Sequence, residues 1–440
     1  MNCYLFIDNF RGFSNARIPI TNVNFLVGQN STGKTSVLGL LKLFSGPRFL
    51  YEQVFGDEQV TFGHFSDMVS AHSDDKSFFR AGLVWEEPTA TVKRNQKLAT
   101  GWLGTFLEEE GLPRLSKYTF CRGSEVVSLR LNGNDIYYKA QTHPGPQTVQ
   151  GILTDLLPQW IDEHSGKMAG GYKRLSMPKA FRSKVPIMVA LSLIGGVHEP
   201  ISRKRVYQFS PANVAVLPEV TWIAPIRTKP RRTYDELSLA FSPEGGHIPY
   251  LIRAMLRSNK SRAEFRAFIE RVGEASGLFQ DIRIKDFGKG TASPFEVDVV
   301  LDGKALNVST VGYGVSQSLP VLVELFRGGH GSWFAIQQPE VHLHPRAQAA
   351  LGDVFFEMAA AEHKLFLVET HSDFTIDRFR MNYRNGRPDK PDSQILFFER
   401  QDKHNVVTPL SIGKSGDLPA EQPEGYRQFF IREELRLLGI

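Results

Sequence analysis

Apolar residues near the start of the chain predict a strand, a loop and a helix in that order. Residues 23–27 are apolar enough for a short buried strand, and residues 36–44 repeat apolar positions at helical spacing. Two further strands are expected ahead of this unit, at 4–7 and 16–20, around a turn at 9–13. The chain is therefore expected to begin with short strands and one helix.

The middle of the chain predicts a mixture of strands and helices. Strand-like runs lie at 79–85, 118–120, 126–131 and 135–139, and the last two are expected to pair. Helical patterns follow at 147–160, 187–195 and 247–276. No sustained heptad repeat supports a coiled coil. This part is expected to form an inserted α+β lobe.

The last part alternates strands and helices, which is typical of a largely parallel sheet covered by helices. The expected elements are, in order, a strand at 333–337, a helix at 347–361, a strand at 364–368, a helix at 374–383 and a strand at 394–398. The predicted fold class is therefore α/β, with a mixed or parallel sheet and a helical cover.

The loop between the first buried strand and its helix carries the P-loop pattern. Residues 28–35 read Gly-Gln-Asn-Ser-Thr-Gly-Lys-Thr, which is glycine, four residues and then Gly-Lys-Thr. Glycines let consecutive backbone N–H groups point at phosphate oxygens, and the helix N-terminus adds partial positive charge. Lys34 would reach the β- and γ-phosphates of ATP, and the Thr35 hydroxyl would ligate Mg²⁺. A chance glycine-rich turn is disfavoured because strand, loop and helix occur in order.

Composition narrows the class of protein without assigning a function. At 440 residues with 41% hydrophobic residues and 32 phenylalanines, the chain can bury a sizeable core and hold two or three domains. It has no run of about twenty apolar residues that would predict a membrane span, and no signal peptide is expected at its start. Its two cysteines, Cys3 and Cys121, suit a reducing cytoplasm. A net charge of +5 permits DNA as a partner without requiring it.

Three later motifs follow the P-loop in an order that points to one kind of ATPase. Residues 312–317 read Gly-Tyr-Gly-Val-Ser-Gln, residues 337–345 read Gln-Gln-Pro-Glu-Val-His-Leu-His-Pro, and residues 369–372 read Glu-Thr-His-Ser. An apolar helix is expected at 318–326, directly after the first motif. This order resembles the signature, Walker B strand and histidine switch of an ABC-type ATPase head of the SMC/RecF/OLD class. It resembles more closely the stand-alone AAA-type ATPases of prokaryotic antiphage defence systems, which are PARIS- or Septu-like.

The resemblance implies a domain layout and a role for each motif. The ATPase core would comprise residues 1–45 and 300–440, and residues 46–299 would form the inserted β-lobe and helical region. ATP and Mg²⁺ would be held in one subunit by Gly28, Asn30, Ser31, Gly33, Lys34, Thr35 and Ser36. The signature of a second subunit would press against the γ-phosphate through Gly312, Gly314, Ser316 and Gln317. His371 would also contact this phosphate, and Arg11 would lie near the phosphates.

The Walker B segment departs from the family pattern. Family members usually carry Asp-Glu, where Asp holds Mg²⁺ through water and Glu polarises the attacking water, but this chain has Gln337 and Gln338. Related defence ATPases often have a glutamate at the first of these positions. An amide positions water but does not accept a proton, and Glu340 is not expected to take over. Gln337, Gln338 and His371 are the catalytic candidates, with Thr35 and Gln337 nearest the metal.

Two explanations of the glutamines stay open. One is a naturally slow site, and the other is a Glu-to-Gln change at 337 made to trap bound ATP. Both predict ATP binding without fast turnover.

Each motif taken alone also has a simpler interpretation. The segment at 312–314 could be a turn, and His371 could be an ordinary histidine. His342 and His344 are interpreted as loop or helix-cap residues rather than metal ligands, because partner ligands are missing. The ordered set is much harder to explain by chance than any one member.

Two basic clusters, at 203–205 and 227–232, could bind DNA or a partner protein, or could be solvated surface. Within the second, Arg227 and Arg231 are candidates for structural or phosphate contacts. A Toprim nuclease would need an Asp-x-Asp pair, and none follows His371. A nuclease or toxin effector is therefore expected on a separate polypeptide.

The leading hypothesis is a cytoplasmic ATPase subunit of an antiphage system. It would form ATP-dependent homodimers, or larger assemblies, that sense a phage trigger protein and hold or release the separate effector. The alternative is a RecF- or SMC-like DNA-repair ATPase that clamps DNA. The long insertion disfavours a transporter nucleotide-binding domain, and the two glutamines leave open a nucleotide-gated assembly protein without catalysis. No membrane partner is expected.

Overall fold

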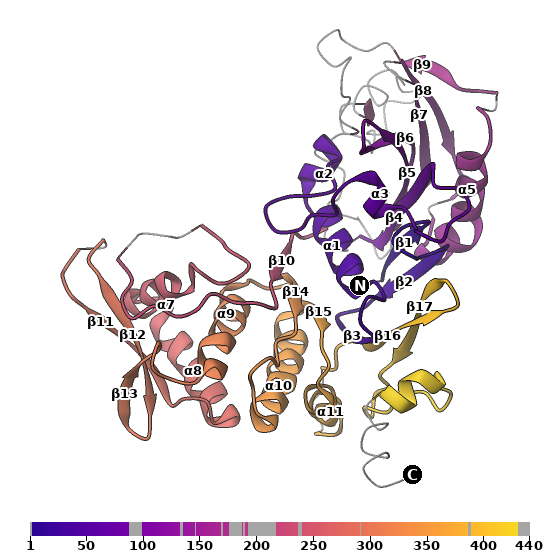
Figure 1. Cartoon of the computed structure of the whole chain (residues 1–440). Helices are drawn as coiled ribbons and strands as arrows, with labels where there is room; N and C mark the ends of the chain where they lie inside the picture. Colours follow the sequence, from indigo (N-terminus) through magenta and orange to yellow (C-terminus); the bar gives the residue numbers. More distant parts are fainter. Residues whose placement is uncertain are drawn as a thin grey trace. The chain divides into compact units, whose positions relative to one another are not determined.

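A computed structural model of the chain contains two compact units, and each is considered by itself (Figure 1). Unit 1 comprises Met1–Thr21, Gln29–Glu219 and Phe398–Val407, and unit 2 comprises Asn22–Gly28, Val220–Phe397 and Thr408–Ile440. The structure describes residues 2–87, 99–132, 135–145, 147–168, 170–175, 187, 190–191, 217–235, 240–290, 292–385 and 389–429. The basic cluster at 203–205 and most of the helix predicted at 187–195 lie outside these residues.

Unit 1 is built on an eight-stranded antiparallel sheet with the order β2-β1-β4-β5-β6-β7-β8-β9. The strands are β1 (Cys3–Asp8), β2 (Ala16–Ile20), β4 (Phe78–Glu86), β5 (Ala99–Glu109), β6 (Leu112–Arg122), β7 (Glu125–Asn132), β8 (Asp135–Thr142) and β9 (Lys173–Leu175). From β4 onwards, each strand pairs with the next along the chain, as in a series of hairpins.

Alternate residues of this sheet face two different helical layers, as the two-residue repeat of a strand requires. Trp102 of β5 packs on one layer, where its ring lies 4.9 Å from that of Phe44 in α1 (Lys34–Ser45). Leu103, the next residue, is instead buried in a cluster with Ile152 and Leu157. The helix that follows the P-loop is therefore held against the sheet by its apolar face.

Short helical segments complete both layers. The layer of α1 also contains α2 (Pro47–Glu52) and α3 (Phe65–Met68), and the opposite layer contains α4 (Val149–Gly151), a π-helical turn at Ile152–Leu156 and α5 (Leu157–Ser165). Phe49 of α2 and Phe65 of α3 contact the aromatic face of the sheet through Trp102 and Phe79. Phenylalanine, the abundant aromatic residue of this sequence, thus supplies much of the core of unit 1.

Unit 2 is built on a six-stranded sheet with the order β10-β14-β15-β3-β16-β17. Its strands are β10 (Val220–Ile223), β14 (Trp333–Gln337), β15 (Leu365–Glu369), β3 (Val23–Gly28), β16 (Ser393–Gln401) and β17 (His404–Ser411). The first four run parallel to one another. Every residue of β3, β14 and β15 is buried, as expected for central strands of a parallel sheet covered on both faces.

Helices and a small second sheet share one apolar core with these strands. The helices are α7 (Ile248–Arg257), α8 (Arg262–Ser276), α9 (Tyr313–Arg327), α10 (Pro345–Glu362) and α11 (Asp373–Met381), and the antiparallel sheet contains β11 (Asp281–Asp286), β12 (Phe295–Leu301) and β13 (Lys304–Asn307). Helix α10 packs on the parallel sheet through Phe355, whose ring lies 5.2 Å from that of Phe366 in β15. The large core of unit 2 fixes the parallel strands that carry the predicted motifs.

The predicted α/β fold with a mixed sheet and helical cover is confirmed, and so are the pairing of β7 with β8 and each strand predicted among the described residues. The helix predicted at 247–276 is in fact two helices, because the polar segment 258–261 breaks it. The strands β5, β9–β13 and β17 were not predicted. The glycines of β5 and the charged positions of β11 conceal their two-residue repeat.

Candidate functional site

The P-loop leaves β3 at Gly28 and enters α1 at Lys34, as the sequence predicts. Ser31 and Gly33 have left-handed backbone, with φ of 60° and 94°, and successive N–H groups in such turns make anion-binding concavities. Lys34 is only 4% exposed, and its ammonium donates to the carbonyl of Gln29 over 2.7 Å. The P-loop residues of unit 1 thus bury the ammonium group of Lys34 beside a turn that is suited to bind phosphate.

The other predicted P-loop residues differ in exposure. Asn30 and Thr35 are exposed, so their side chains are accessible to a ligand of this loop, whereas Ser36 is buried in the first turn of α1. The accessible Thr35 hydroxyl matches its predicted role beside Mg²⁺. Its contact with the metal stays a prediction.

The turn at 9–13 packs directly against the P-loop within unit 1. A Cβ atom at Gly33 would lie 2.4 Å from the ring of Phe13, so only glycine fits this position, which also has a positive φ. Arg11 donates to the carbonyls of Phe62 and Asp67 over 2.9 and 3.0 Å, and burial lowers its pKa. The structure therefore gives Arg11 a structural contact, and its predicted place near phosphate stays a prediction.

Two residues that the sequence reasoning missed tie this turn to the P-loop. Arg400 of β16 donates to the carbonyl of Ser31 over 3.1 Å and to the side chain of Asn405 over 3.2 Å. Asn405 of β17 donates in turn to the carbonyl of Arg11 over 2.9 Å. These residues lie in a distant part of the sequence that matches no motif, so only the fold reveals them.

In unit 2, the carboxyl ends of the parallel strands meet at one edge of the sheet. Strand β15 lies between β3 and β14, with Glu369 in register with Leu26 on one side and with Gln337 on the other. The N–H of Thr370 donates to the carbonyl of Leu26 over 3.2 Å. Ligands of open α/β sheets bind at this edge, and the strand that leads into the P-loop ends there.

The two Walker B glutamines lie at this edge and contact the end of β15. The Gln337 amide donates to a carboxylate oxygen of Glu369 over 3.1 Å, and both side chains are buried. The backbone N–H of Gln338 donates to the carbonyl of Glu369 over 2.7 Å, and Gln338 has a φ of 43°. A left-handed conformation in a residue other than glycine is costly and clusters at functional sites. Glu369 was not among the predicted site residues, although it precedes the predicted Thr370-His371 segment.

Arg227 forms a hydrogen bond with the backbone of the Walker B strand. It is buried, and its guanidinium donates to the carbonyl of Gln337 over 3.0 Å. Burial lowers the pKa of Arg227 to about 10, while the nearby Glu340 acts in the opposite direction, so the guanidinium stays charged at neutral pH. The structure therefore assigns Arg227 a structural contact, as one of the two interpretations from sequence expected.

Glu340 joins the Walker B segment to the predicted switch histidine. Its Oε1 accepts a hydrogen bond from the backbone N–H of His371 over 2.7 Å. Burial raises the pKa of Glu340, and hydrogen bonds from this N–H and from Thr370 oppose the rise. The His371 side chain is exposed and its ring stacks on that of Phe429 at 6.1 Å. Glu340 Oε1 therefore holds the backbone at His371, and the expectation that Glu340 does not replace the missing acid stays a prediction.

The signature segment forms the start of a helix. Helix α9 begins at Tyr313 with Gly312 at its N-cap, so the expectation of a helix beginning at Ser318 is wrong, because the helical backbone already includes the signature. Gly312 is exposed, and a Cβ atom there would meet nothing within 4 Å. The exposed N-terminus of α9 is thus open to an anion.

The side chains of the signature point into unit 2. Ser316 and Gln317 are 7% and 6% exposed; the Ser316 hydroxyl donates to the carbonyl of Tyr313, and the Gln317 amide donates to that of Arg227. Ser316 also lines a cavity of about 340 Å³ together with Lys229. Because these two side chains are buried, the predicted contact with the γ-phosphate of a second subunit depends more on the exposed backbone around Gly312.

The signature and the Walker B segment are in contact within unit 2. A Cβ atom at Gly314 would lie 2.8 Å from the carbonyl of His342, and the rings of Tyr313 and His342 lie 5.7 Å apart. His342 lies in a turn with a φ of 66°, and His344 occupies the N-cap position of α10. The interpretation of both histidines as loop or cap residues is confirmed, and no cluster of three metal-ligating side chains occurs in the described parts of the chain.

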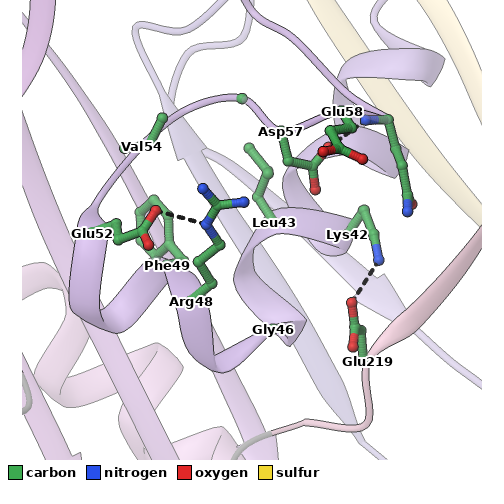
Figure 2. Close-up of a pocket in the computed structure, with 12 residues that line it drawn as sticks. Lys42, Leu43, Gly46, Arg48, Phe49, Glu52, Val54, Asp57, Glu58 and Glu219 are labelled. Carbon is green, nitrogen blue, oxygen red and sulfur yellow. Dashed lines mark hydrogen bonds and ion pairs between the residues drawn. The ribbon is translucent and has the colours of Figure 1, made fainter.

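A separate cavity of about 290 Å³ in unit 1 contains none of the predicted site residues (Figure 2). Its two basic side chains are paired with acids of the same cavity: Lys42 bonds to Glu219 over 2.9 Å, and Arg48 bonds to Glu52 over 2.6 Å. Both cations therefore have a partner without a ligand. This cavity therefore adds nothing to the candidate site.

The residues fit ATP and Mg²⁺ by their chemistry. The left-handed turn and the buried Lys34 suit a polyphosphate, and Thr35 offers an accessible hydroxyl. Protein-bound Mg²⁺ takes one or two carboxylates, keeps several waters and is completed by phosphate oxygens. Within unit 2, the carboxylate of Glu369 lies at the carboxyl edge of β14 and β15. ATP and Mg²⁺ stay cofactors implied by these groups.

Two family models match separate parts of the chain. The model described as "AAA domain, putative AbiEii toxin, Type IV TA system" matches residues 230–377, and the model described as "AAA ATPase domain" matches residues 1–82. The first match includes the signature, the Walker B segment and His371, and the second includes the P-loop. Both halves of the predicted ATPase core thus resemble AAA-type ATPase domains.

Several solved structures are similar to the chain over most of its length at low identity. The SMC head domain of Pyrococcus furiosus, bound to the C-terminal domain of ScpA, is 12% identical over 98% of each chain, with a TM-score of 0.41. The SMC head of Thermotoga maritima is 12% identical over 93% of this chain and 98% of its own, with a TM-score of 0.38. A RecF structure is 10% identical over 92% of this chain and 98% of its own, with a TM-score of 0.28.

A comparison with curated proteins found no match. Among the residues that the structure describes, no helix has the length and apolar character needed to cross a membrane.

We predict that Lys34→Ala weakens ATP binding about 10- to 150-fold, because a hydrogen bond to a charged group contributes roughly 1.5–3 kcal/mol. Equilibrium titration with a fluorescent ATP analogue measures the affinity. Lys42→Ala is the matched control, since Lys42 lies on the same helix but bonds to Glu219, and its affinity is expected to equal that of the unmodified chain. An unchanged affinity in Lys34→Ala contradicts the P-loop assignment.

Proposed function

We propose that the chain is an ATP-binding, slowly hydrolysing ATPase of the SMC/RecF type that dimerises on ATP. In this proposal the dimer is a cytoplasmic sensor and scaffold that controls a separate nuclease or toxin effector in antiphage defence. The observation that carries the ATPase assignment is the buried Lys34 inside a left-handed loop between a strand of the parallel sheet and a helix. The matches to AAA-type ATPase domains at residues 1–82 and 230–377 support it.

Phosphate binding in this proposal depends on the chain's own N–H groups and on Lys34. The turn from Gln29 to Gly33 and the N-terminus of α1 would hold the phosphates, and the Thr35 hydroxyl would hold the metal. Bound Mg²⁺ would neutralise charge on the β- and γ-phosphates. Hydrolysis also requires activation of a water molecule, and the amides of Gln337 and Gln338 are poor proton acceptors.

Slow hydrolysis is proposed because amides stand at both Walker B positions. Gln337 is occupied by its hydrogen bond to Glu369, and Gln338 is partly exposed at the carboxyl edge of the sheet. An amide side chain can orient water but cannot take its proton at neutral pH. A long-lived ATP state suits a scaffold that must stay assembled until a trigger arrives.

The ATP-dependent dimer is proposed from the exposed helix N-terminus at the signature. The N–H groups of Tyr313 and Gly314 lie in the first turn of α9, and they would meet the γ-phosphate of a second copy. Two such sites would make an isologous two-fold dimer. The division into a core at 1–45 and 300–440 and an insertion at 46–299 stays part of this proposal, with the insertion available for larger assemblies.

A DNA-clamping ATPase is the second candidate, and one observation favours it. Lys229, Arg231 and Arg232 are exposed on the segment after β10, and exposed basic side chains bind phosphates of DNA without reading sequence. In the defence proposal the same side chains would contact the effector or trigger. Binding to duplex DNA separates the two candidates.

Turnover is expected to rise about 10²- to 10⁴-fold in Gln338→Glu, because a glutamate supplies the general base that the amide lacks. Phosphate release under single-turnover conditions measures the rate. Gln428→Glu, at an exposed glutamine elsewhere in unit 2, serves as the control and is expected to leave the rate unchanged. A rate of roughly 10 per second in the unmodified chain, typical of enzymes, would rule out the slow site.

Gly312→Glu is expected to leave ATP binding to the monomer intact while weakening the ATP-dependent dimer at least about 100-fold, since like charges at an interface cost several kcal/mol. The exposed site tolerates the side chain, and a carboxylate at a helix N-terminus stabilises the helix. Light scattering with and without ATP and Mg²⁺ measures assembly. Ser316→Arg is expected to act similarly, but Ser316 is buried, so its fold must be checked first.

Gly329→Glu, at another exposed glycine of unit 2 with open space around its Cβ, is the control for this experiment. A chain that stays monomeric at high concentration with ATP and Mg²⁺ bound would contradict the composite site. A dimer unaffected by Gly312→Glu would contradict the assigned contact.

The choice between defence and DNA repair is tested by two measurements on the same chain. Expressed with its neighbouring genes, it is expected to reduce phage plating in a Lys34-dependent way, while its affinity for duplex DNA stays that of non-specific binding, roughly 10⁻⁴–10⁻⁶ M at physiological salt. ATP-dependent tight DNA binding together with unaltered phage plating would favour the clamp instead.

A further inference from the structure

A cavity of about 340 Å³ in unit 2 lies beside the helix that begins with the signature. Leu319 and Pro320 of α9 line it, together with residues of α7 and β12. Two cations, Lys229 and Arg231, and no carboxylate occur among the described residues of its lining. Small-molecule pockets measure about 300–1,000 Å³, so this cavity is large enough for a small organic ligand.

The two cations of this cavity have no acidic partner within the described part of the chain. Lys229 and Arg231 are both exposed, whereas the neighbouring Arg232 approaches Glu296 to 4.0 Å. The Thr228 side chain, which also lines the cavity, is exposed as well. A concave surface that is lined by charges of one sign raises the local concentration of the opposite ion. The lining therefore favours an anion.

The segment that carries these groups is anchored by hydrogen bonds. The N–H of Thr228 donates to the carbonyl of Glu244 over 2.8 Å, and the N–H of Arg231 donates to the Tyr234 hydroxyl over 3.0 Å. Tyr234 exchanges two backbone hydrogen bonds with Phe295, at 2.9 and 3.0 Å. Because the backbone is already held in place, less conformational entropy is lost when a ligand binds there.

The rest of the cavity lining is mostly apolar. Its buried apolar residues come from α7, β12, the segment after β13 and α9, and they are Ile248, Ile252, Val297, Val308 and Leu319. The rings of Tyr234 and Tyr250, which lie 6.0 Å apart, also line it. Such a surface gains from covering an apolar ring and gains nothing from a fully hydrated ion. The lining therefore favours an anion that carries an apolar group.

One acid lies close to the cavity without lining it. Glu244 is exposed, and it accepts a hydrogen bond over 2.7 Å from the hydroxyl of Ser242, which does line the cavity. Its negative charge opposes the binding of an anion, although solvent screens it. Removal of this charge should therefore strengthen the binding of an anion, whereas removal of either cation should weaken it.

We propose that this cavity binds a small phosphate monoester with an apolar ring, with the phosphate at Lys229, Arg231 and Thr228. A phosphate monoester carries a charge of about −1.5 to −2 at pH 7, which matches two cations better than a single carboxylate does. The arginine fork also fits phosphate oxygens. None of the lining residues belongs to the P-loop, so this inference goes beyond the proposed ATPase function and does not depend on it. Arg232 stays available to a macromolecular partner.

The test is an equilibrium fluorescence titration of the full chain with naphthyl phosphate. Naphthol lacks the charge, and inorganic phosphate lacks the ring. Each is expected to bind at least about 10-fold more weakly than naphthyl phosphate, because each makes only one part of the contacts. The affinity for naphthyl phosphate in Lys34→Ala is expected to equal that of the unmodified chain.

Variants at exposed positions test the sign of the charge effect, and such changes have little effect on the fold. Lys229→Ala and Arg231→Ala are each expected to weaken the binding of naphthyl phosphate at least about 10-fold, while Lys229→Arg keeps most of the affinity. Glu244→Gln is expected to strengthen it up to about 5-fold. Lys260→Ala, at another exposed lysine of unit 2, is the matched control and is expected to change nothing.

Gly246→Leu tests the cavity independently of its charges. Gly246 lines the cavity, and a Cβ atom there would meet only the hydroxyl oxygens of Ser242 and Thr228, both at 3.9 Å. A leucine side chain would therefore fill part of the cavity and is expected to abolish the binding of naphthyl phosphate. Thermal unfolding checks that the variant is folded, and the exposed variants decide the question if it is not.

Three results would overturn the proposal. One is equal affinity for naphthol and naphthyl phosphate, or no binding of naphthyl phosphate at all. Another is an affinity that is lost in Lys34→Ala and unchanged in Lys229→Ala and Arg231→Ala, which would place the phosphate in the P-loop. The third is a short DNA duplex that binds through Lys229 and Arg231 while naphthyl phosphate does not compete with it, which would favour the DNA clamp.

Discussion

The parallel alignment of three buried strands is the constraint on which the candidate site depends. Because β3, β15 and β14 run in the same direction, the chain must leave all three at the same edge of the sheet. Two segments far apart in the sequence, which end at Gly28 and Gln337, thereby finish at the same edge of one sheet, on either side of β15. The strands are held in place by one apolar core that they share with the helices of unit 2.

Hydrogen bonds connect residues at this edge of the sheet with the signature within unit 2. Glu340 holds the backbone of His371, Arg227 holds that of Gln337, and the amide of Gln317 reaches the carbonyl of Arg227. Movement of any one group would disturb the others, because each bond is buried or partly buried and lost hydrogen bonds there are costly. Such linkage is what a protein needs if the state of its nucleotide is to alter the surface it offers to a second copy.

Local patterns in the sequence were sufficient for the P-loop, the parallel strands and the α/β fold, since each is encoded by a few consecutive residues. They were insufficient where a contact joins distant residues. Arg400 and Asn405 contact the P-loop turn and the turn at 9–13 from two strands that lie far along the sequence. Glu369 lies beside Gln337 only because of the register of β15 with β14. The start of α9 was placed too late because Gly312 and Gly314 resemble a turn, although Gly312 is a helix cap and Gly314 permits close packing against His342.

The central proposal is that the turn before Lys34 binds the phosphates of ATP. A crystal structure of the full chain with Mg²⁺ and a non-hydrolysable ATP analogue tests it most directly. The account predicts phosphate oxygens within hydrogen-bond distance of the backbone N–H groups of the turn from Gln29 to Gly33 and of the Lys34 ammonium. Nucleotide bound elsewhere on the chain would contradict it.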